Sequence, residues 1–356
     1  MSCTQSKVLE NIVPDAKGHR TVVRAFAALG RGQALQPWEY EPGPLGADDV
    51  ELAVTHCGVC HTDLHLLIGN EMGISTYPLV PGHEAIGTIV AVGEQVRGLS
   101  VGQRVGVGFQ RAACDQCEWC QKGLQNLCRS LRPTAVAGYG GFAQFLRANH
   151  QFAIPVPDEL DSASAAPLLC AGISVYAPLV RFARPGSRIG IIGIGGLGHL
   201  AVQFARAMGA EVVAFSTSAD KQEEAHRLGA HHFVLSQKSE QMRRAAASLD
   251  VLVSTATVNL DLNAWLGTLR PNGTFCLLGV PPEPVSLTVW PTMVMSQLSF
   301  CASAIGTPQQ ISEMLRFAAL HNVQPSVEVL PMKEVNLALD RVRANKARYR
   351  MVLANS

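Results

Sequence analysis

The feature that most constrains the fold of this chain is a regular alternation of strand-like and helix-like segments between residues 188 and 278. Such alternation predicts a parallel, doubly wound sheet whose strands are joined by right-handed helical crossovers. Residues 297–302 form a further apolar run, which we expect to be a sixth strand at an edge of this sheet. The other predicted strands are 188–193, 211–215, 232–235, 250–254 and 274–278, and the predicted helices are 196–208, 221–228, 240–247 and 260–269.

A glycine-rich turn follows the first of these strands and opens the first helix. It reads Gly193, Ile194, Gly195, Gly196, Leu197, Gly198. In a dinucleotide site the first glycine permits a tight turn, the second lets the backbone approach a pyrophosphate, and the last lets the helix pack closely on the strand. The helix N-terminus then holds the anion. The strand–turn–helix context favours a dinucleotide site over a simple turn.

The end of the second strand distinguishes between NAD and NADP. An NAD site places an Asp or Glu there to bind the ribose 2′-hydroxyl. This chain instead has Ser216, Thr217 and Ser218, followed by Lys221, whereas Asp220 is interpreted as an ordinary first-turn helix residue. Hydroxyl groups and a lysine suit a 2′-phosphate. The sequence predicts a preference for NADP(H); the alternative is a helix N-cap beside a solvated lysine.

The N-terminal half has a different character. From residue 21 to about residue 150, short apolar runs are separated by glycine and proline turn signals, which is typical of an antiparallel, barrel-like domain. A chain of 356 residues with 47% hydrophobic residues can form two domains. Helices expected near 311–321 and 335–346 would return the chain to the first domain.

Charge and composition exclude several classes of partner. Lys plus Arg number 29 against 28 for Asp plus Glu, so the chain has no basic excess for nucleic acid or an anionic membrane. Its longest uncharged run, residues 284–312, contains prolines and many polar side chains, and residues 1–20 show no secretory signal. We expect a cytoplasmic protein that acts on small molecules.

Four of the ten cysteines lie within fifteen residues, at Cys114, Cys117, Cys120 and Cys128. Disulfides are a poor default for a chain without an export signal, so clustered cysteines indicate a metal. Four thiolates complete a tetrahedral zinc shell and leave no vacant position. This spacing therefore predicts a structural zinc site, with a pair of disulfides as the alternative.

A second metal site would have to be assembled from separated residues. Cys60 ends a strand-like run, His83 begins another, and Cys170 lies near the junction of the two predicted domains. Two cysteines and one histidine form a catalytic zinc set with a fourth position open for water or substrate. From the spacing alone, a single histidine such as His83 is more often a hydrogen-bonded interior residue, and Cys170 is more often a buried thiol.

Taken together, these motifs resemble the zinc-dependent medium-chain alcohol dehydrogenases, in the branch of cinnamyl alcohol dehydrogenases and NADP-dependent aldehyde reductases. The resemblance runs from about Thr21 to Leu353. It implies an α/β protein with a GroES-like antiparallel β-barrel catalytic domain and a Rossmann doubly wound parallel sheet. The implied catalytic domain is 1–172 with a structural zinc lobe at 112–130, completed by 305–356, and the NADP-binding domain is 173–304.

The resemblance also implies roles for the residues that match the family's metal motifs. Cys60, His83 and Cys170 would hold a catalytic zinc, with Glu84 as a close or transient fourth ligand. Asp63 would orient His83. Two zinc ions per chain would therefore be expected, one catalytic and one structural.

Other matching positions concern the proton path and the cofactor. Thr62 and His65 match proton-relay positions, His61 matches the position that contacts the cofactor pyrophosphate, and Cys57 is interpreted as a packing residue. Positions expected to approach the nicotinamide are Ser174, Thr255, Gly279, Ser303, Ala304 and Ile305. The implied reaction transfers a hydride between NADP(H) and primary alcohols or aldehydes, aliphatic or aromatic and including the cinnamyl type, with zinc polarising the substrate oxygen.

Three alternatives remain at this point. They are an NAD-linked zinc polyol or secondary-alcohol dehydrogenase, a zinc-free quinone or enoyl reductase on the same scaffold, and a non-enzymatic cofactor-binding protein. The apolar edge strand at 297–302 and the resemblance predict a homodimer through sheet extension. Candidate substrate-pocket residues are Trp119, Leu124, Trp290 and Met293.

Overall fold

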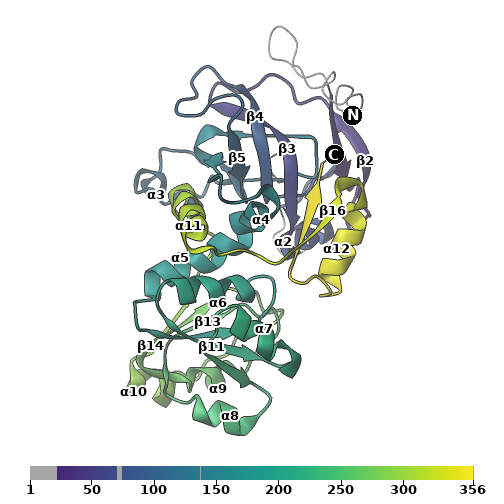
Figure 1. Cartoon of the computed structure of the whole chain (residues 1–356). Coiled ribbons are helices and arrows are strands. Elements are labelled where there is room, and N and C mark those ends of the chain that lie inside the picture. Colours follow the sequence, from purple (N-terminus) through teal and green to yellow (C-terminus); the bar gives the residue numbers. More distant parts are fainter. Residues whose placement is uncertain (1–21, 70–73, 137, 356) are drawn as a thin grey trace. The chain divides into compact units, whose positions relative to one another are not determined.

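The computed structural model describes residues 22–69, 74–136 and 138–355, and the predicted polar lead-in at 1–20 lies outside these described residues. By its internal contacts the chain divides into two units (Figure 1). The first unit ends at Leu169 and resumes at Val327, and the second is Cys170–Ser326. Each unit is described separately below.

The first unit is built on a seven-stranded sheet in the order β16-β17-β3-β4-β5-β9, with β8 paired to β3. All its strand pairs are antiparallel except β16–β17. Its long central strands appear in purple and blue in Figure 1. The sheet consists of β3 (Asp49–Val59), β4 (Ala85–Val92), β5 (Arg104–Val107), β8 (Phe145–Asn149), β9 (Ile154–Pro155), β16 (Val327–Pro331) and β17 (Arg350–Ala354).

Smaller elements surround this sheet. Two strand pairs, β1–β2 and β6–β7, form separate two-stranded sheets. The elements are β1 (Val23–Ala27), β2 (Gln36–Tyr40), α2 (His61–Ile68), β6 (Gln110–Ala112), α3 (Glu118–Gln121), β7 (Arg132–Pro133), α4 (Ser162–Pro167) and α12 (Val335–Arg343). The core combines sheet residues such as Leu52 and Ile89 with Leu339 of α12. The predicted antiparallel domain is thus present, and chain segments from both ends of the sequence complete it.

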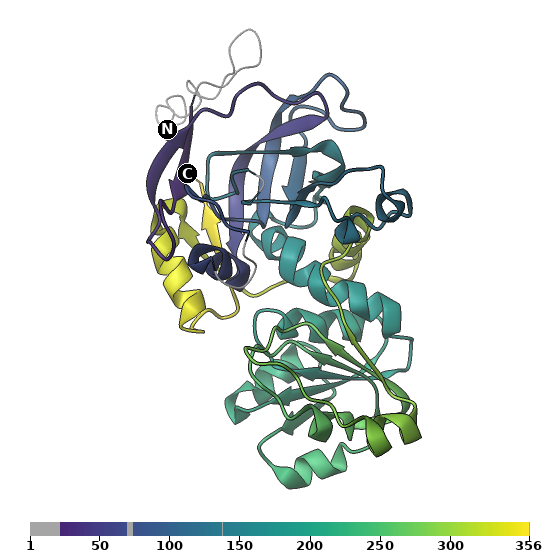
Figure 2. The ribbon, with the colours of Figure 1, turned by 180° about the vertical axis from the view of Figure 1, so that it is seen from behind.

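The second unit contains a six-stranded sheet in the order β12-β11-β10-β13-β14-β15, and every pair in it is parallel. Numbered along the chain, this order is 3-2-1-4-5-6, the doubly wound arrangement of dinucleotide-binding sheets. Figure 2 shows the sheet with helices on its faces. The strands are β10 (Arg188–Ile192), β11 (Glu211–Ser216), β12 (His232–Leu235), β13 (Leu249–Ser254), β14 (Leu269–Leu277) and β15 (Ser299–Ala302).

The predicted α/β fold class is therefore confirmed, and β15 lies at the expected edge. The four helices expected between the strands are shorter than predicted, for example Ser239–Arg244 in place of 240–247. The helix expected from 311 instead begins earlier, at Pro308. The helices of this unit are α5 (Ile173–Phe182), α6 (Gly198–Ala207), α7 (Gln222–Arg227), α8 (Ser239–Arg244), α9 (Leu262–Leu266), α10 (Val294–Ser296) and α11 (Pro308–His321).

The boundary at the end of the second unit differs from the expected one. The sequence placed residues 305–326 with the first domain, whereas the contacts place them in the second unit. Helix α11 packs on α5, where the rings of Phe317 and Tyr176 lie 5.6 Å apart. The sequence of an amphipathic helix shows that one of its faces must be buried, but it does not show against which element that face packs.

One helical stretch, Ser162–Phe182, is long and apolar enough to cross a membrane, with a mean hydropathy of 1.6. However, 78% of its apolar window is buried inside the protein. Burial of this extent is typical of a core helix.

Candidate functional site

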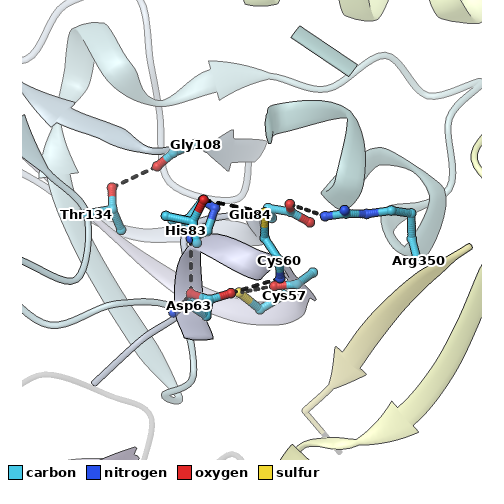
Figure 3. Close-up of polar contacts among 11 residues, drawn as sticks. Cys57, Cys60, Asp63, His83, Glu84, Gly108, Thr134 and Arg350 are labelled. Atoms are coloured by element: carbon cyan, nitrogen blue, oxygen red, sulfur yellow. Dashed lines mark hydrogen bonds and ion pairs between the residues drawn. The ribbon is translucent and has the colours of Figure 1, made fainter. Parts of the chain in front are cut away.

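The metal-ligand motif of the first unit is organised by the carboxylate of Asp63. This fully buried side chain lies in the first turn of α2. Its Oδ2 accepts a hydrogen bond from the backbone nitrogen of Cys60 (2.9 Å), and its Oδ1 accepts one from the backbone nitrogen of Gly82 (2.9 Å). The Nδ1 atom of His83 lies 3.0 Å from the same Oδ1. A single carboxylate therefore fixes the start of α2 and the residues that precede β4 (Figure 3).

This arrangement orients the two ring nitrogens of His83 differently. Nδ1 is held by Asp63, whereas Nε2 is buried and has no hydrogen-bond partner among the described residues. The ring of Phe109 lies edge-on at 5.7 Å from the ring of His83. A histidine that donates one N–H to a carboxylate and presents the other nitrogen inward is oriented as a metal ligand.

Glu84 follows directly and is also completely buried. Its Oε1 pairs with Arg350 of β17, whereas Oε2 has no hydrogen-bond partner within the described part of the chain. A Cβ placed on Gly58 would lie only 1.8 Å from Oε2, so the carboxylate occupies space that only a glycine leaves open. Burial raises the pKa of Glu84 to about 7, although Arg350 opposes that rise.

The sulfur of Cys170 completes a group of four possible ligands with Cys60, His83 and Glu84. One ligand atom from each of these residues lies within 4.8 Å of the others, and all four residues are buried. Cys170 is held in a π-helical turn, Leu168–Gly172. Turns of this kind are frequent at functional sites. Two thiols, an imidazole with an unpartnered nitrogen and a carboxylate with an unpartnered oxygen match the donor set of a catalytic zinc.

The four-cysteine segment forms a second group of possible ligands. The sulfurs of Cys114, Cys117, Cys120 and Cys128 lie within 4.8 Å of one another, and none of them is in a disulfide. Cys114 Sγ lies 3.5 Å from Cys128 Sγ and 3.9 Å from Cys120 Sγ. Four sulfurs at about 2.3 Å from a tetrahedral zinc would be roughly 3.8 Å apart, so these spacings fit the ion.

The local backbone also favours a thiolate in this segment. The backbone N–H groups of Gln116 and Cys117 lower the pKa of Cys114 to about 6. The nitrogen of Cys117 is 3.4 Å from Cys114 Sγ. Because zinc binds thiolate rather than thiol, the lowered pKa makes Cys114 a suitable zinc ligand.

The other expected residues of the first unit lie on or beside α2. Thr62 and His65 are one helical turn apart, and Thr62 Oγ1 is 3.6 Å from Cys60 Sγ. The rings of His61 and His65 are 6.3 Å apart. Cys57 is fully buried in β3 and does not belong to either group of possible ligands.

The glycine-rich turn of the second unit has three distinct geometries. Gly193 has a positive φ of 86°, and a Cβ on Gly198 would lie 1.8 Å from the backbone oxygen of Gly193. At Gly195, by contrast, a Cβ would meet no atom of the described chain within 4 Å. The chain itself therefore requires glycine at 193 and 198, whereas the space above Gly195 is available for a ligand.

The hydroxyl-rich segment after β11 contacts this turn. Lys221 Nζ donates a hydrogen bond to the backbone oxygen of Ile194 at 2.6 Å. Ser216 Oγ accepts one from the nitrogen of Ser218 at 3.1 Å. The lysine ammonium group thus lies between the glycine turn and the end of β11, where a dinucleotide ribose would be placed.

The remaining cofactor positions follow the carboxyl ends of the neighbouring strands. Thr255, after β13, donates its hydroxyl to the oxygens of Ile192 (3.0 Å) and Gly193 (2.9 Å). The nitrogen of Ser303, after β15, donates to Leu277 at 3.3 Å. Gly279 follows β14, Ala304 and Ile305 follow Ser303, and Ser174 lies in α5. The carboxyl edge of a doubly wound sheet is where such folds bind their ligands.

The expected substrate-pocket residues are distributed over both units. Trp119 and Leu124 belong to the four-cysteine region of the first unit, where the ammonium of Lys122 lies 5.4 Å from the Trp119 ring. Trp290 and Met293 belong to the second unit, and Trp290 is 66% exposed. The structure therefore does not group these four residues within one unit.

Two features could not be identified from the sequence: Arg350, and the hydrogen bonds that Thr134 donates beside Phe109. Arg350 is separated from its partner Glu84 by 266 positions, so the local sequence gave no signal for the pair. Thr134 donates its hydroxyl to the oxygen of Gly108 at 2.7 Å, and its nitrogen donates to the oxygen of Phe109 at 2.7 Å. These bonds hold the backbone of Phe109, whose ring packs on His83. Figure 3 shows the bond between Thr134 and Gly108.

Comparison with known proteins gives matches across both units. Residues 46–158 match the family described as "Alcohol dehydrogenase GroES-like domain", and residues 196–319 match "Zinc-binding dehydrogenase". The chain is 46% identical over 336 residues to "Aldehyde reductase AdhA" of Synechocystis sp., which covers 94% of this chain and 99% of that protein.

Solved structures show the same similarity. A cinnamyl alcohol dehydrogenase from Sorghum bicolor superposes with a TM-score of 0.88 at 36% identity, covering 94% of this chain and 97% of that one. An enzyme described as CAD from Helicobacter pylori, complexed with NADP(H), gives a TM-score of 0.84 at 29% identity, with coverages of 94% and 98%.

Proposed function

This chain belongs to the zinc-dependent medium-chain alcohol dehydrogenase family, in the cinnamyl alcohol dehydrogenase branch, and from that premise we propose how its residues carry out alcohol and aldehyde oxidoreduction. The proposal assigns a catalytic zinc to Cys60, His83 and Cys170 with Glu84 beside them, a structural zinc to the four-cysteine segment, and NADP(H) to the second unit. The buried, unpartnered Nε2 of His83 within the four-ligand group is the observation that carries it.

When bound, the zinc supplies Lewis acidity towards a substrate oxygen and the nicotinamide supplies or accepts a hydride. The chain contributes placement. Asp63 fixes the backbone of Cys60 and the ring of His83 relative to each other, and the ring of Phe109 packs edge-on against the imidazole. Thr62 Oγ1 receives or returns the substrate proton, and His65 passes it to solvent from the next turn of α2.

Metal analysis tests the zinc assignment. We expect two zinc ions per chain in the purified protein and one in Cys60→Ala, which should lose nearly all turnover while it still binds NADP(H). His65→Ala should slow turnover by about 10²-fold or less, because solvent can replace one relay member. Full activity in protein stripped of zinc would overturn this part of the proposal, and would favour the zinc-free reductase alternative.

The preference for NADP(H) is proposed from the position of Lys221 and from the residues that end β11. The ammonium group of Lys221 lies on the glycine turn, and Ser216, Thr217 and Ser218 bring no carboxylate that would repel a 2′-phosphate. The relative from Helicobacter pylori was crystallised with NADP(H), which supports the same choice.

A pair of variants tests this preference. Ser216→Asp should lower kcat/KM for NADPH and raise it for NADH. Lys221→Ala should lower kcat/KM for NADPH alone by about tenfold or more, as expected for the loss of one charge-assisted contact. Lys238→Ala, at an exposed lysine of the same unit, is the control and should leave both values unchanged. Equal efficiency of the wild type with NADH and NADPH would contradict the proposal and favour the NAD-linked alternative.

The substrate proposal is an aldehyde or primary alcohol of aliphatic or aromatic type, supported by relatives named aldehyde reductase and cinnamyl alcohol dehydrogenase. We also propose a homodimer formed through β15, the edge strand of the second sheet. Nearby apolar side chains are exposed, including Trp290 at 66% and Met295 at 68%. A reduction panel of aldehydes and sugars tests the first proposal, and a monomer in sedimentation equilibrium would refute the second.

A further inference from the structure

Two cysteines of the second unit, Cys276 and Cys301, belong to neither group of possible metal ligands. Cys276 lies in β14 and Cys301 in β15, the last two strands of the parallel sheet. The strand register makes them direct partners. Paired residues on neighbouring strands project to the same face of a sheet, so the two side chains stand side by side.

The spacing at this position is suitable for a disulfide. Neighbouring strands lie about 4.7–4.9 Å apart, and disulfides join Cα atoms that are about 4.4–6.8 Å apart. Cys301 lies close enough to Cys276 to raise the pKa of its thiol. The preceding pair, Phe275 and Phe300, stacks on the opposite face with ring centroids 5.4 Å apart, which holds the register that keeps the cysteines opposed.

The two thiols differ in access to solvent. Cys276 is completely buried, whereas Cys301 is partly exposed on the edge strand. Burial raises the pKa of Cys276, Cys301 raises it further, and the guanidinium of Arg181 in α5 opposes the rise. In the single chain a small oxidant can therefore reach Cys301 before Cys276, which lies behind it and is completely buried.

We propose that Cys276 and Cys301 form an oxidisable dithiol that reacts with hydroperoxides and closes to a disulfide between β14 and β15. The Cys301 thiolate attacks a peroxide oxygen, the O–O bond breaks, and the sulfur becomes a sulfenic acid while hydroxide leaves and takes up a proton. The Cys276 sulfur then attacks the sulfenic sulfur. The S–S bond forms, the S–OH bond breaks, and hydroxide leaves with the proton of Cys276 as water.

Each disulfide therefore consumes one hydrogen peroxide and two thiol hydrogens and releases two waters. The bond would tie the edge strand β15 to the sheet and close the connection between residues 277 and 300. Such a closed loop resists unfolding, because the cross-link restricts the unfolded chain. Reductants of the thiol class would reverse the change.

The experiment uses the reduced, zinc-loaded full chain treated with a small molar excess of hydrogen peroxide. Remaining thiols are alkylated with iodoacetamide, and the protein is cleaved between the two cysteines, for example after Leu287. We expect the two resulting peptides to remain joined, with a mass lower by two hydrogens, and to separate after reduction. Zinc content measured in parallel should stay unchanged, which distinguishes this reaction from oxidation of the metal ligands.

Two serine variants test the order of the steps. In Cys276→Ser, the sulfenic acid on Cys301 has no partner and should be captured by dimedone in higher yield than in the wild type. In Cys301→Ser, Cys276 should be neither labelled nor oxidised at the same peroxide dose. Full alkylation of both cysteines in the treated wild type would overturn the proposal, and so would equal dimedone labelling of Cys301 in the wild type and in Cys276→Ser.

Discussion

Replacement of Asp63 by Asn tests most directly how the first unit organises its ligands. The carboxylate accepts two bonds at Oδ1, from Gly82 and His83, and one at Oδ2, from the nitrogen of Cys60. An amide can keep the two bonds at its oxygen, but its NH₂ group would face the Cys60 N–H as donor against donor. The side chain would stay buried with this pair unsatisfied, because Asp63 is fully enclosed.

The magnitude follows from these bonds. An unsatisfied buried donor costs about 1–3 kcal/mol. The two retained bonds are no longer charge-assisted and become weaker, which adds about 1 kcal/mol. We therefore expect Asp63→Asn to lower the free energy of unfolding in urea by about 2–4 kcal/mol. Because partners of metal-binding histidines typically contribute 10–100-fold to metal affinity, zinc should also bind more weakly by about that factor.

Asp161→Asn provides the matched control. Asp161 also caps a helix in the same unit, where its Oδ1 accepts from the nitrogen of Ser164 at 2.9 Å. Asn is as good an N-cap as Asp, so this variant should change the free energy of unfolding by less than about 0.5 kcal/mol and should keep all of its zinc. If Asp63→Asn were as stable as this control and retained its zinc affinity, Asp63 would not be the organising residue.

Three further predictions follow from contacts of single side chains. Gly198→Ala should distort the glycine turn and abolish dinucleotide binding, because its Cβ would lie 1.8 Å from a backbone oxygen. Gly195→Ala, where a Cβ meets no atom of the described chain within 4 Å, should keep the melting temperature of the wild type and lose only cofactor affinity, measured by calorimetry. Cys128→Ser should bind one zinc fewer by elemental analysis and unfold at lower temperature, while any zinc retained at full occupancy would argue against a four-cysteine site. Thr134→Val should lower the free energy of unfolding in urea by about 1–3 kcal/mol, because it leaves the oxygen of Gly108 buried without its 2.7 Å hydrogen bond. An unchanged free energy of unfolding would show that this bond does not stabilise the protein.

Much of the second unit could be predicted because its signals are local. Strand β12, His232–Leu235, coincides with the predicted run, and the turn from Gly193 to Gly198 lies where the motif placed it. Apolar periodicity, glycine positions and strand–helix alternation each act within a few residues. The four-cysteine group could be predicted for the same reason, since all four cysteines lie within fifteen residues.

The features that were missed depend on contacts between distant parts of the chain. The sequence showed that α11 has one apolar face, but not that this face packs on α5. It showed that Glu84 follows His83, the proposed metal ligand, but not that Arg350 would pair with Glu84 or that Gly58 would leave room for its carboxylate. Such pairs form only after the sheet has aligned strands that are remote in sequence, so no local pattern encodes them.

The first unit is interrupted by the second, and this has a consequence for synthesis on the ribosome. Strand β17 lies between β16 and β3 in the sheet and carries Arg350, yet it is translated only after the whole of the second unit. The doubly wound unit is contiguous and can fold while translation continues, as domains generally do. Until β17 is synthesised, the part of β3 that pairs with it has an exposed edge and the carboxylate of Glu84 lacks its counter-ion. A chain terminated before residue 350 would therefore contain the complete doubly wound unit but not the Glu84–Arg350 pair.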